Sequence, residues 1–183
     1  MTIIAAYKDN EGYWIGSDSC TFWGYVKIDC GTKLIENKNY IMGLAGLSRY
    51  KEIIKDNRYL IPEINKYKDL QDLRESIQEK IITEAKTKQI ASSDQETLRH
   101  DFELLLITKI GIYKIDGNYG ITKMLENFAA IGHGNDFALG SLYSSKKNKI
   151  KGKIAVTTAI KSAIKYDIYC AGNVHIKKLE IKN

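Results

Sequence analysis

The sequence of 183 residues is poor in residues that break or cross-link a chain, with one proline and three cysteines. A single proline excludes long proline-rich linkers. The cysteines Cys20, Cys30 and Cys170 are odd in number, and no two of them have the close spacing of a metal-ligand pair. A disulfide framework is therefore not indicated, and a reduced, cytoplasmic compartment fits best.

Other signals are missing as well. No apolar run reaches the ~20 residues that a membrane-spanning helix needs. The N-terminus lacks the basic start, apolar stretch and cleavage site of a signal peptide. No Gly-x-x-x-x-Gly-Lys-Ser/Thr phosphate loop occurs, so any ATP dependence has to come from a separate protein. We expect neither a membrane partner nor a nucleotide cofactor.

The composition that remains is that of an ordinary globular domain. Hydrophobic residues make up 44% and charged residues 27% of the chain. The length fits one domain, residues 1–183, with a sizeable core. The net charge is +6, but the basic residues are scattered rather than clustered. This indicates a lysine-rich solvated surface, so nucleic-acid binding is not expected.

The hydrophobic pattern predicts an α+β domain. The first 46 residues favour a β-meander with strands over 2–8, 13–18, 33–35 and 40–46 and a less regular strand and loop over 19–32. Later strands are expected over 102–108, 110–115, 128–131 and 174–181.

Helical spacing of apolar residues predicts four helices. Two are expected over 48–56 and about 69–85, a third over 135–143, and a fourth whose apolar face holds Val156, Ala159, Ile160, Ala163 and Ile164. A lysine-rich turn is expected over 146–153. Apolar strands need cover on both faces, so we expect two packed antiparallel sheets, each roofed by a helix pair, in a four-layer αββα sandwich.

A set of short motifs runs in a fixed order along the whole chain. The set comprises Thr2 after Met1, Gly16-Ser17-Asp18, Lys33, Gly43-Leu44-Ala45-Gly46, Gly132-His133-Gly134, and Asp167 with Cys170. In this order the motifs resemble those of the N-terminal nucleophile hydrolases. Within that superfamily the chain resembles the proteasome β-subunits, and its length is most similar to that of the HslV-type threonine peptidases. The resemblance implies the αββα fold, a homo-oligomeric ring, polypeptide substrates and a separate AAA+ ATPase unfoldase.

The resemblance also implies roles for the first three motifs. Thr2 would be the nucleophile after Met1 removal, because one terminal residue then supplies both a hydroxyl and an α-amine with a pKa of ~7.7–8.0. Lys33 would lower the pKa of the Thr2 hydroxyl and amine through its positive charge. Asp18 would be the partner of that buried ammonium.

The later motifs match the family less closely. Gly46 aligns with the glycine whose N–H binds the oxyanion, and Asp167 with a residue that orients the site. His133 stands where the family usually has Ser, and it could relay a proton or hold a water. Cys170 replaces a Ser or Thr. Residues 47–50 differ from the small residues usual there, so the cleavage preference cannot be carried over.

The resemblance implies no required cofactor, although backbone carbonyls of Ile164, Asp167 and Cys170 align with a site for a monovalent or divalent cation. Two other functions stay open at this point. One is a catalytically silent ring-forming or scaffold protein on the same fold, favoured if Met1 is retained and by the changes at His133 and Cys170. The other is an amidase that attacks a small substrate with the same nucleophile.

Overall fold

The computed structural model describes residues 2–46, 48, 50–52, 83, 102–118 and 120–181. Its strands are β1 (Ile3–Asp9), β2 (Gly12–Ser17), β3 (Cys20–Trp23), β4 (Val26–Asp29), β5 (Leu34–Asn37), β6 (Tyr40–Gly46), β7 (Phe102–Thr108), β8 (Gly111–Asp116), β9 (Ile121–Lys123), β10 (Phe128–Gly132) and β11 (His175–Glu180). The helices that lie wholly within the described residues are α3 (Asn135–Lys147) and α4 (Gly152–Tyr166).

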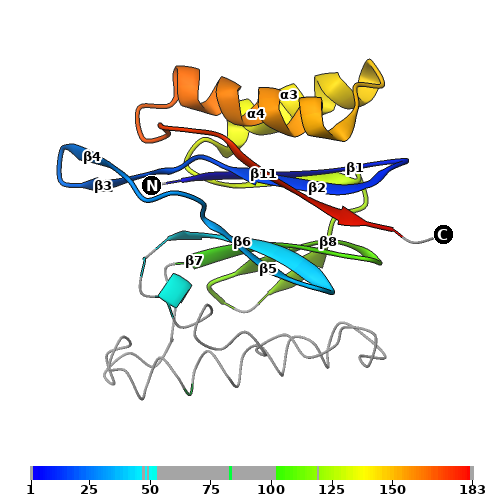
Figure 1. Ribbon diagram of the computed structural model, residues 1–183, viewed down its shortest axis with the longest axis horizontal. Coiled ribbons are helices and arrows are strands. Elements are labelled where there is room, and N and C mark those ends of the chain that lie inside the picture. Colours follow the sequence, from blue (N-terminus) through cyan, green and yellow to red (C-terminus); the bar gives the residue numbers. More distant parts are fainter. Residues whose placement is uncertain are drawn as a thin grey trace.

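The strands form two antiparallel sheets and a separate hairpin. One sheet has the order β10-β1-β2-β11 and the other the order β5-β6-β7-β8-β9, while β3 pairs only with β4. Figure 1 shows α3 and α4 lying over the outer face of the first sheet, with the second sheet packed beneath it. The predicted α+β class is confirmed, with three of the four expected layers in view.

The fourth expected layer falls mostly outside the described residues. Ser48 and residues 50–52 are helical, as the expected helix over 48–56 requires, and Thr83 is helical within the one over 69–85. The remainder of these two predicted helices lies in parts of the chain that the structure does not describe.

Strand β1 contributes to two hydrophobic cores at once. Ile3, Ala5 and Tyr7 pack in the cluster under α3 and α4, whereas Ile4 and Ala6 pack in the cluster between the sheets. This follows from the period-two alternation of side chains along a strand. An apolar run such as Ile3-Ile4-Ala5-Ala6 is therefore buried on both faces.

Two glycines let the layers approach closely. A Cβ at Gly16 would lie 2.5 Å from Ile176 and 2.6 Å from Ile160, so the glycine admits α4 against β2. A Cβ at Gly43 would lie 2.6 Å from the end of the Ile4 side chain, so this glycine admits β1 against β6.

The fourth predicted helix is confirmed, because Val156, Ala159, Ile160 and Ala163 are fully buried in α4 and Ile164 packs against the same cluster. The third helix was predicted too short. It continues past Tyr143 to Lys147, where basic residues in the last turn interact favourably with the helix dipole. The expected turn over 146–153 was therefore wrong at both ends, because α3 continues to Lys147 and α4 begins at Gly152.

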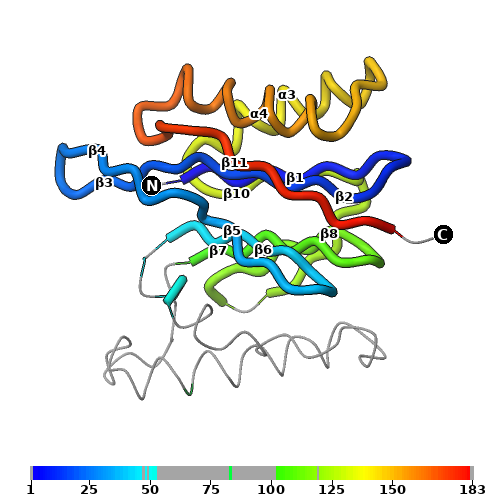
Figure 2. Tube along the Cα trace, in the orientation of Figure 1, coloured from blue at the N-terminus to red at the C-terminus, as the bar shows by residue number. Residues whose placement is uncertain are grey.

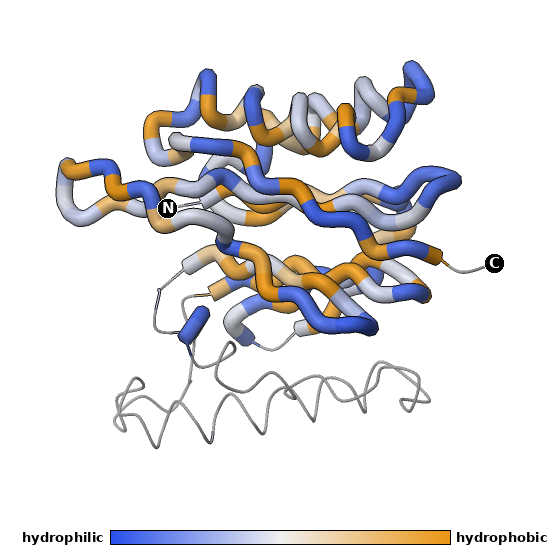
Figure 3. The backbone as a smooth tube through the Cα atoms, viewed as in Figure 1, coloured by the Kyte–Doolittle hydropathy of each residue, from blue (hydrophilic) through white to orange (hydrophobic). Residues whose placement is uncertain are grey.

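The sequence pattern also missed elements that do not face a core. All four residues of β4 are exposed, so burial imposes no alternation on them. The β3–β4 hairpin extends away from the two sheets, and Figure 3 shows hydrophobic and hydrophilic residues mixed along it. Strand β9 has only three residues and was not predicted. Among the described helices, none is long and apolar enough to cross a membrane.

Candidate active site

Three predicted residues from different strand ends meet at one point. Thr2 immediately precedes β1, Asp18 follows β2, and Lys33 precedes β5. Figure 2 places the start of β1 at the end of the molecule that carries the β3–β4 hairpin. The chain from 18 to 33 leaves the first sheet, forms that hairpin and returns, which brings Asp18 and Lys33 together.

The Lys33 ammonium is buried and donates hydrogen bonds to three acceptors in the described part of the chain. It donates to Thr2 Oγ1 at 2.9 Å, to Asp18 Oδ1 at 2.7 Å and to the Cys20 carbonyl at 2.5 Å. Only 5% of Lys33 is exposed to solvent. An ammonium has three N–H donors and each has an acceptor here, so the positive charge is held in a fixed position beside the Thr2 hydroxyl.

The fully buried Asp18 carboxylate ties three segments together. Oδ1 accepts from Ile3 N at 3.1 Å as well as from Lys33, and Oδ2 accepts from Ala171 N at 3.3 Å. Burial raises the pKa of the Asp18 carboxyl, while the Lys33 ammonium and these backbone donors oppose that effect. Asp18 therefore fixes the start of β1 and the segment after α4 relative to Lys33.

The backbone of Thr2 is held by the turn that follows β10. His133 N donates to the Thr2 carbonyl at 2.9 Å. Gly132 has φ +91°, and a Cβ there would overlap the Thr2 carbonyl oxygen, so only glycine fits. Gly132 N donates to Glu103 Oε2 at 3.0 Å. Sequence reasoning missed Glu103, although a charged residue within the otherwise apolar run 102–108 is a signal that could have found it.

His133 and Asp167 form a second, adjacent pair. His133 Nδ1 lies 2.5 Å from Asp167 Oδ2, and the His133 ring meets the Tyr169 ring edge-on at 4.6 Å. The Asp167 side chain is 5% exposed and the His133 side chain 49%. Because a carboxylate is only an acceptor, Nδ1 carries a proton, and in the neutral imidazole Nε2 is then an acceptor on a half-exposed ring.

Asp167 was expected to orient the site, and among the described residues its hydrogen-bond partners, His133 and Tyr169, lie next to that site. It holds His133 through Oδ2 and accepts from Tyr169 N through Oδ1 at 2.7 Å. His133 in turn contacts Thr2 through its backbone N–H. Asp167 thus reaches the Thr2 segment through His133, and Tyr169 is a further contact that the sequence did not indicate.

Cys170 is buried, and its sulfur lies against Gly134, where a Cβ would come within 2.8 Å of Sγ. Burial, followed by the nearby Asp18 and Asp167 carboxylates, raises the pKa of this thiol to about 12. It is therefore a protonated packing group at neutral pH rather than a nucleophile.

The expected cation site depends on backbone carbonyls. The Asp167 carbonyl accepts from Cys170 N at 3.2 Å, and Ile164 packs by its side chain against the core under α3 and α4. In the described part of the chain, no group of three or more His, Cys, Asp or Glu side chains is placed to hold a metal. A carbonyl-bound cation stays a prediction.

Gly46 ends β6 with φ +114° and is exposed. The preceding residue, Ala45, is buried, and its Cβ lies 3.4 Å from where a Cβ at Gly132 would stand. Gly46 therefore follows a residue that packs beside the Thr2–Gly132 contact. Its backbone N–H is a candidate donor next to that contact, and the oxyanion role stays a prediction.

Comparisons with known proteins give the fold but no close relative. No protein-family model and no curated protein matches the chain. The solved structure of BPH from Thiobacillus denitrificans in complex with Epoxomicin matches with 17% identity, 100% of both chains covered and a TM-score of 0.78. A second structure of that BPH matches with 16% identity, 99% of each chain covered and a TM-score of 0.82.

Eukaryotic HslV from Trypanosoma brucei matches with 17% identity over 98% of this chain and 99% of the other, with a TM-score of 0.75. At such identities the likeness establishes a common fold over the full length. The resemblance to the HslV and proteasome type is thus confirmed at the level of fold.

Proposed function

We propose that this protein is a threonine-dependent endopeptidase and a subunit of a self-compartmentalising, HslV-like ring. The observation that carries the proposal is the 2.9 Å contact between the buried Lys33 ammonium and the Thr2 hydroxyl. The full-length likeness to BPH and HslV supports it. Polypeptide substrates, a cytoplasmic location and a separate ATPase unfoldase belong to the same proposal.

The reaction requires removal of Met1, which leaves a free α-amine on Thr2. That amine accepts the hydroxyl proton while Oγ1 bonds to the carbonyl carbon of the scissile peptide. The Lys33 ammonium stabilises the negative charge that develops on Oγ1, and Gly46 N–H holds the oxyanion. The amine then protonates the leaving nitrogen as the C–N bond breaks, and water hydrolyses the resulting ester to restore Thr2.

We assign His133 to the water step. Asp167 fixes the imidazole with Nδ1 protonated, so Nε2 can accept a proton from a water that enters from the exposed side. The backbone N–H of His133 donates a hydrogen bond to the Thr2 carbonyl, so the imidazole belongs to a residue that contacts the backbone of the nucleophile. No cofactor is required for these steps, and a cation on the carbonyls of Ile164, Asp167 and Cys170 would only steady the segment after α4.

The test combines an intact-mass measurement with a matched variant series. We expect the purified protein to begin at Thr2, to cleave unstructured polypeptides, and to gain mass on incubation with epoxomicin, which the T. denitrificans BPH structure contains. Thr2→Ala should abolish cleavage and the mass gain, while Thr2→Ser, which keeps a hydroxyl, should retain measurable cleavage. Full activity in Thr2→Ala would refute the proposal, as would a native mass equal to that of a monomer.

A silent ring-forming protein is the second candidate, and one observation favours it. Thr2 is only 7% exposed, which restricts the access of a substrate to its hydroxyl. This candidate predicts a ring-sized native mass with Met1 retained and no epoxomicin adduct. An amidase would instead begin at Thr2 and hydrolyse small amides but leave polypeptides intact.

A further inference from the structure

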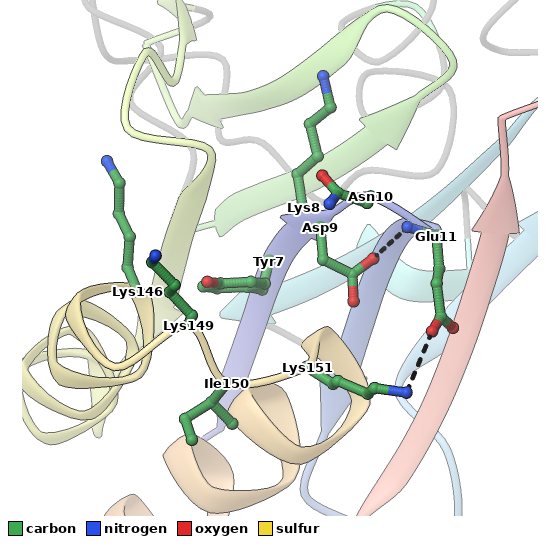
Figure 4. Close-up of a pocket in the computed structure, with 9 residues that line it drawn as sticks. All are labelled: Tyr7, Lys8, Asp9, Asn10, Glu11, Lys146, Lys149, Ile150 and Lys151. Carbon is green, nitrogen blue, oxygen red and sulfur yellow. Dashed lines mark hydrogen bonds and ion pairs between the residues drawn. The ribbon is translucent and has the colours of Figure 1, made fainter.

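A pocket of about 380 Å³ lies far from Thr2, where the β1–β2 turn meets the turn between α3 and α4 (Figure 4). Thr2 precedes β1 and this pocket lies at the end of β1, so the two are separated by the length of the strand, roughly 20 Å at ~3.3 Å per residue. Figure 1 shows the two regions at opposite ends of the molecule. The pocket is therefore distinct from the candidate active site.

The floor of the pocket carries a buried hydroxyl group without a partner. Tyr7 is only 6% exposed, and among the described residues its hydroxyl has no hydrogen-bond donor or acceptor. Figure 4 shows this hydroxyl directed into the pocket, on the side of Lys146 and Lys149. A buried polar group without a partner costs free energy, so its position indicates that a ligand or water completes its hydrogen bonding.

The Tyr7 hydroxyl is available as a donor. Burial and then the Asp9 carboxylate raise the pKa of Tyr7, and Lys146 opposes this only in part. The phenol is therefore protonated at neutral pH and can donate to an acceptor in the pocket.

The two carboxylates of the pocket are already occupied. Asp9 accepts from Glu11 N at 2.9 Å, Gly12 N at 3.1 Å, Trp14 Nε1 at 3.2 Å and Gly152 N at 2.7 Å. The last of these donors is at the N-terminus of α4, where negative charge is favourable. Glu11 lies 3.6 Å from the Lys151 ammonium and 4.0 Å from that of Lys178. These contacts also join the β1–β2 turn to α4 and so fix the shape of the pocket.

Positive charge remains after these pairs are made. Within the described residues Lys149 has no carboxylate partner, and Lys146, which pairs with Glu126 at 2.5 Å, keeps further N–H donors. The pocket thus offers a neutral O–H donor on its floor and two ammonium groups beside it. Multiple ammonium donors suit a dianion better than a singly charged group.

We propose that this pocket binds a phosphate group, with Tyr7 Oη and the ammonium groups of Lys146 and Lys149 as its donors. A phosphate monoester has pKa₂ ≈ 6 and carries about −1.5 to −2 charges at neutral pH, which matches two ammonium groups. The volume of about 380 Å³ is within the ~300–1,000 Å³ range of small-molecule sites, so a phosphate monoester fits as well as the free ion.

Calorimetric titration of the full-length protein at constant ionic strength tests the proposal. The probes are inorganic phosphate, adenosine 5′-monophosphate, adenosine and acetate. We expect saturable binding of the two phosphates, no binding of adenosine, and acetate at least about tenfold weaker than phosphate. If adenosine 5′-monophosphate binds more tightly than inorganic phosphate, the ligand is a phosphorylated metabolite. If the two bind equally, the ligand is the free ion. Both results support the site.

Three substitutions locate the binding. Tyr7→Phe removes only the hydroxyl and Lys149→Gln only one charge, and each should weaken phosphate binding by about tenfold, the effect of one charge-assisted hydrogen bond. Lys161→Gln makes the same charge change at an exposed position of α4 that does not line the pocket, and should leave the affinity unchanged. The Tm of ligand-free Tyr7→Phe should not fall, because the hydroxyl has no protein partner.

The proposal is overturned if the wild-type protein shows no phosphate binding up to 10 mM, a concentration on the order of the weakest useful affinities. It is also overturned if acetate binds as tightly as phosphate, or if Lys161→Gln weakens binding as much as Lys149→Gln does. None of these outcomes depends on peptidase activity at Thr2.

Discussion

The ammonium of Lys33 lies 2.9 Å from the hydroxyl oxygen of Thr2, a residue thirty-one positions earlier in the chain. The contact is buried, and the same ammonium bonds Asp18 and the Cys20 carbonyl. Since three acceptors fix its position, the charge cannot turn toward solvent without breaking the network. The electrostatic field at the Thr2 oxygen is therefore built into the fold before any substrate binds.

Removing the Lys33 charge should damage both stability and activity. Lys33→Met leaves the fully buried Asp18 without its counter-charge, which we expect to cost about 3–5 kcal/mol in free energy of unfolding, measured by urea denaturation. Asp18→Asn combined with Lys33→Met should recover part of that loss, because no charge then remains buried. Peptidase activity should be absent from both variants. If Lys33→Met alone is as stable as the wild type, the buried ion pair between Lys33 and Asp18 is contradicted.

The glycine at position 132 should be indispensable. Gly132→Ala forces a side chain into a left-handed backbone conformation and against the Thr2 carbonyl, so we expect a loss of at least about 1 kcal/mol in stability and of most activity. Gly140→Ala is the matched control, because that glycine lies in α3 with no atom near its Cβ position. This control should stabilise the protein by about 0.5–1 kcal/mol in thermal unfolding.

Substitutions of His133 can separate its two ring nitrogens. His133→Asn places an N–H donor near the former Nδ1, so Asp167 keeps a partner and stability should change little. His133→Ala removes that partner and should cost about 1–3 kcal/mol. Both lack Nε2, so both should lose about a hundredfold in deacylation rate in single-turnover assays. Equal deacylation in His133→Asn and wild type would remove His133 from the water step.

The three thiols should differ in reactivity. Cys30 is exposed, whereas Cys20 and Cys170 are buried. The pKa of Cys170 is raised to about 12, so at pH 8 its thiolate form is almost absent in the folded protein and appears only on unfolding. We expect Ellman's reagent to titrate one thiol in native protein and three in guanidinium, with Cys30→Ser reducing the native value to zero. Rapid labelling of Cys170 in native protein would contradict its burial.

Much of the fold could be predicted because buried apolar residues recur at the regular spacing of a helix or a strand. The face of α4 and the apolar run at the start of β1 follow from the spacing of residues that enter a core. The β4 strand could not be found in this way, because none of its side chains is buried and nothing selects their alternation. The end of α3 was missed for the same reason, since its last turn is lysine-rich and largely solvent-facing.

The residues of the candidate site likewise fall into those that were predicted and those that only the structure shows. Thr2, Asp18 and Lys33 were expected together only through the resemblance, because residue spacing alone does not bring the ends of different strands into contact. The structure adds Glu103, whose carboxylate orients Gly132 N, and Tyr169, whose ring packs on His133. Both depend on how the β10–α3 turn packs against segments distant in the sequence, β7 for Glu103 and the residues after α4 for Tyr169. Such tertiary contacts leave no pattern in the local sequence.

Strand β1 lies between β10 and β2 and has side chains in both cores. This burial determines how slowly its amide protons exchange. Amide protons in such a strand exchange with solvent only when the whole domain opens. In deuterium exchange, Ile4–Ala6 should therefore be among the slowest sites, whereas the exposed β3–β4 hairpin should exchange quickly. Thr2, joined directly to β1, keeps its place beside Lys33 for as long as the domain stays folded.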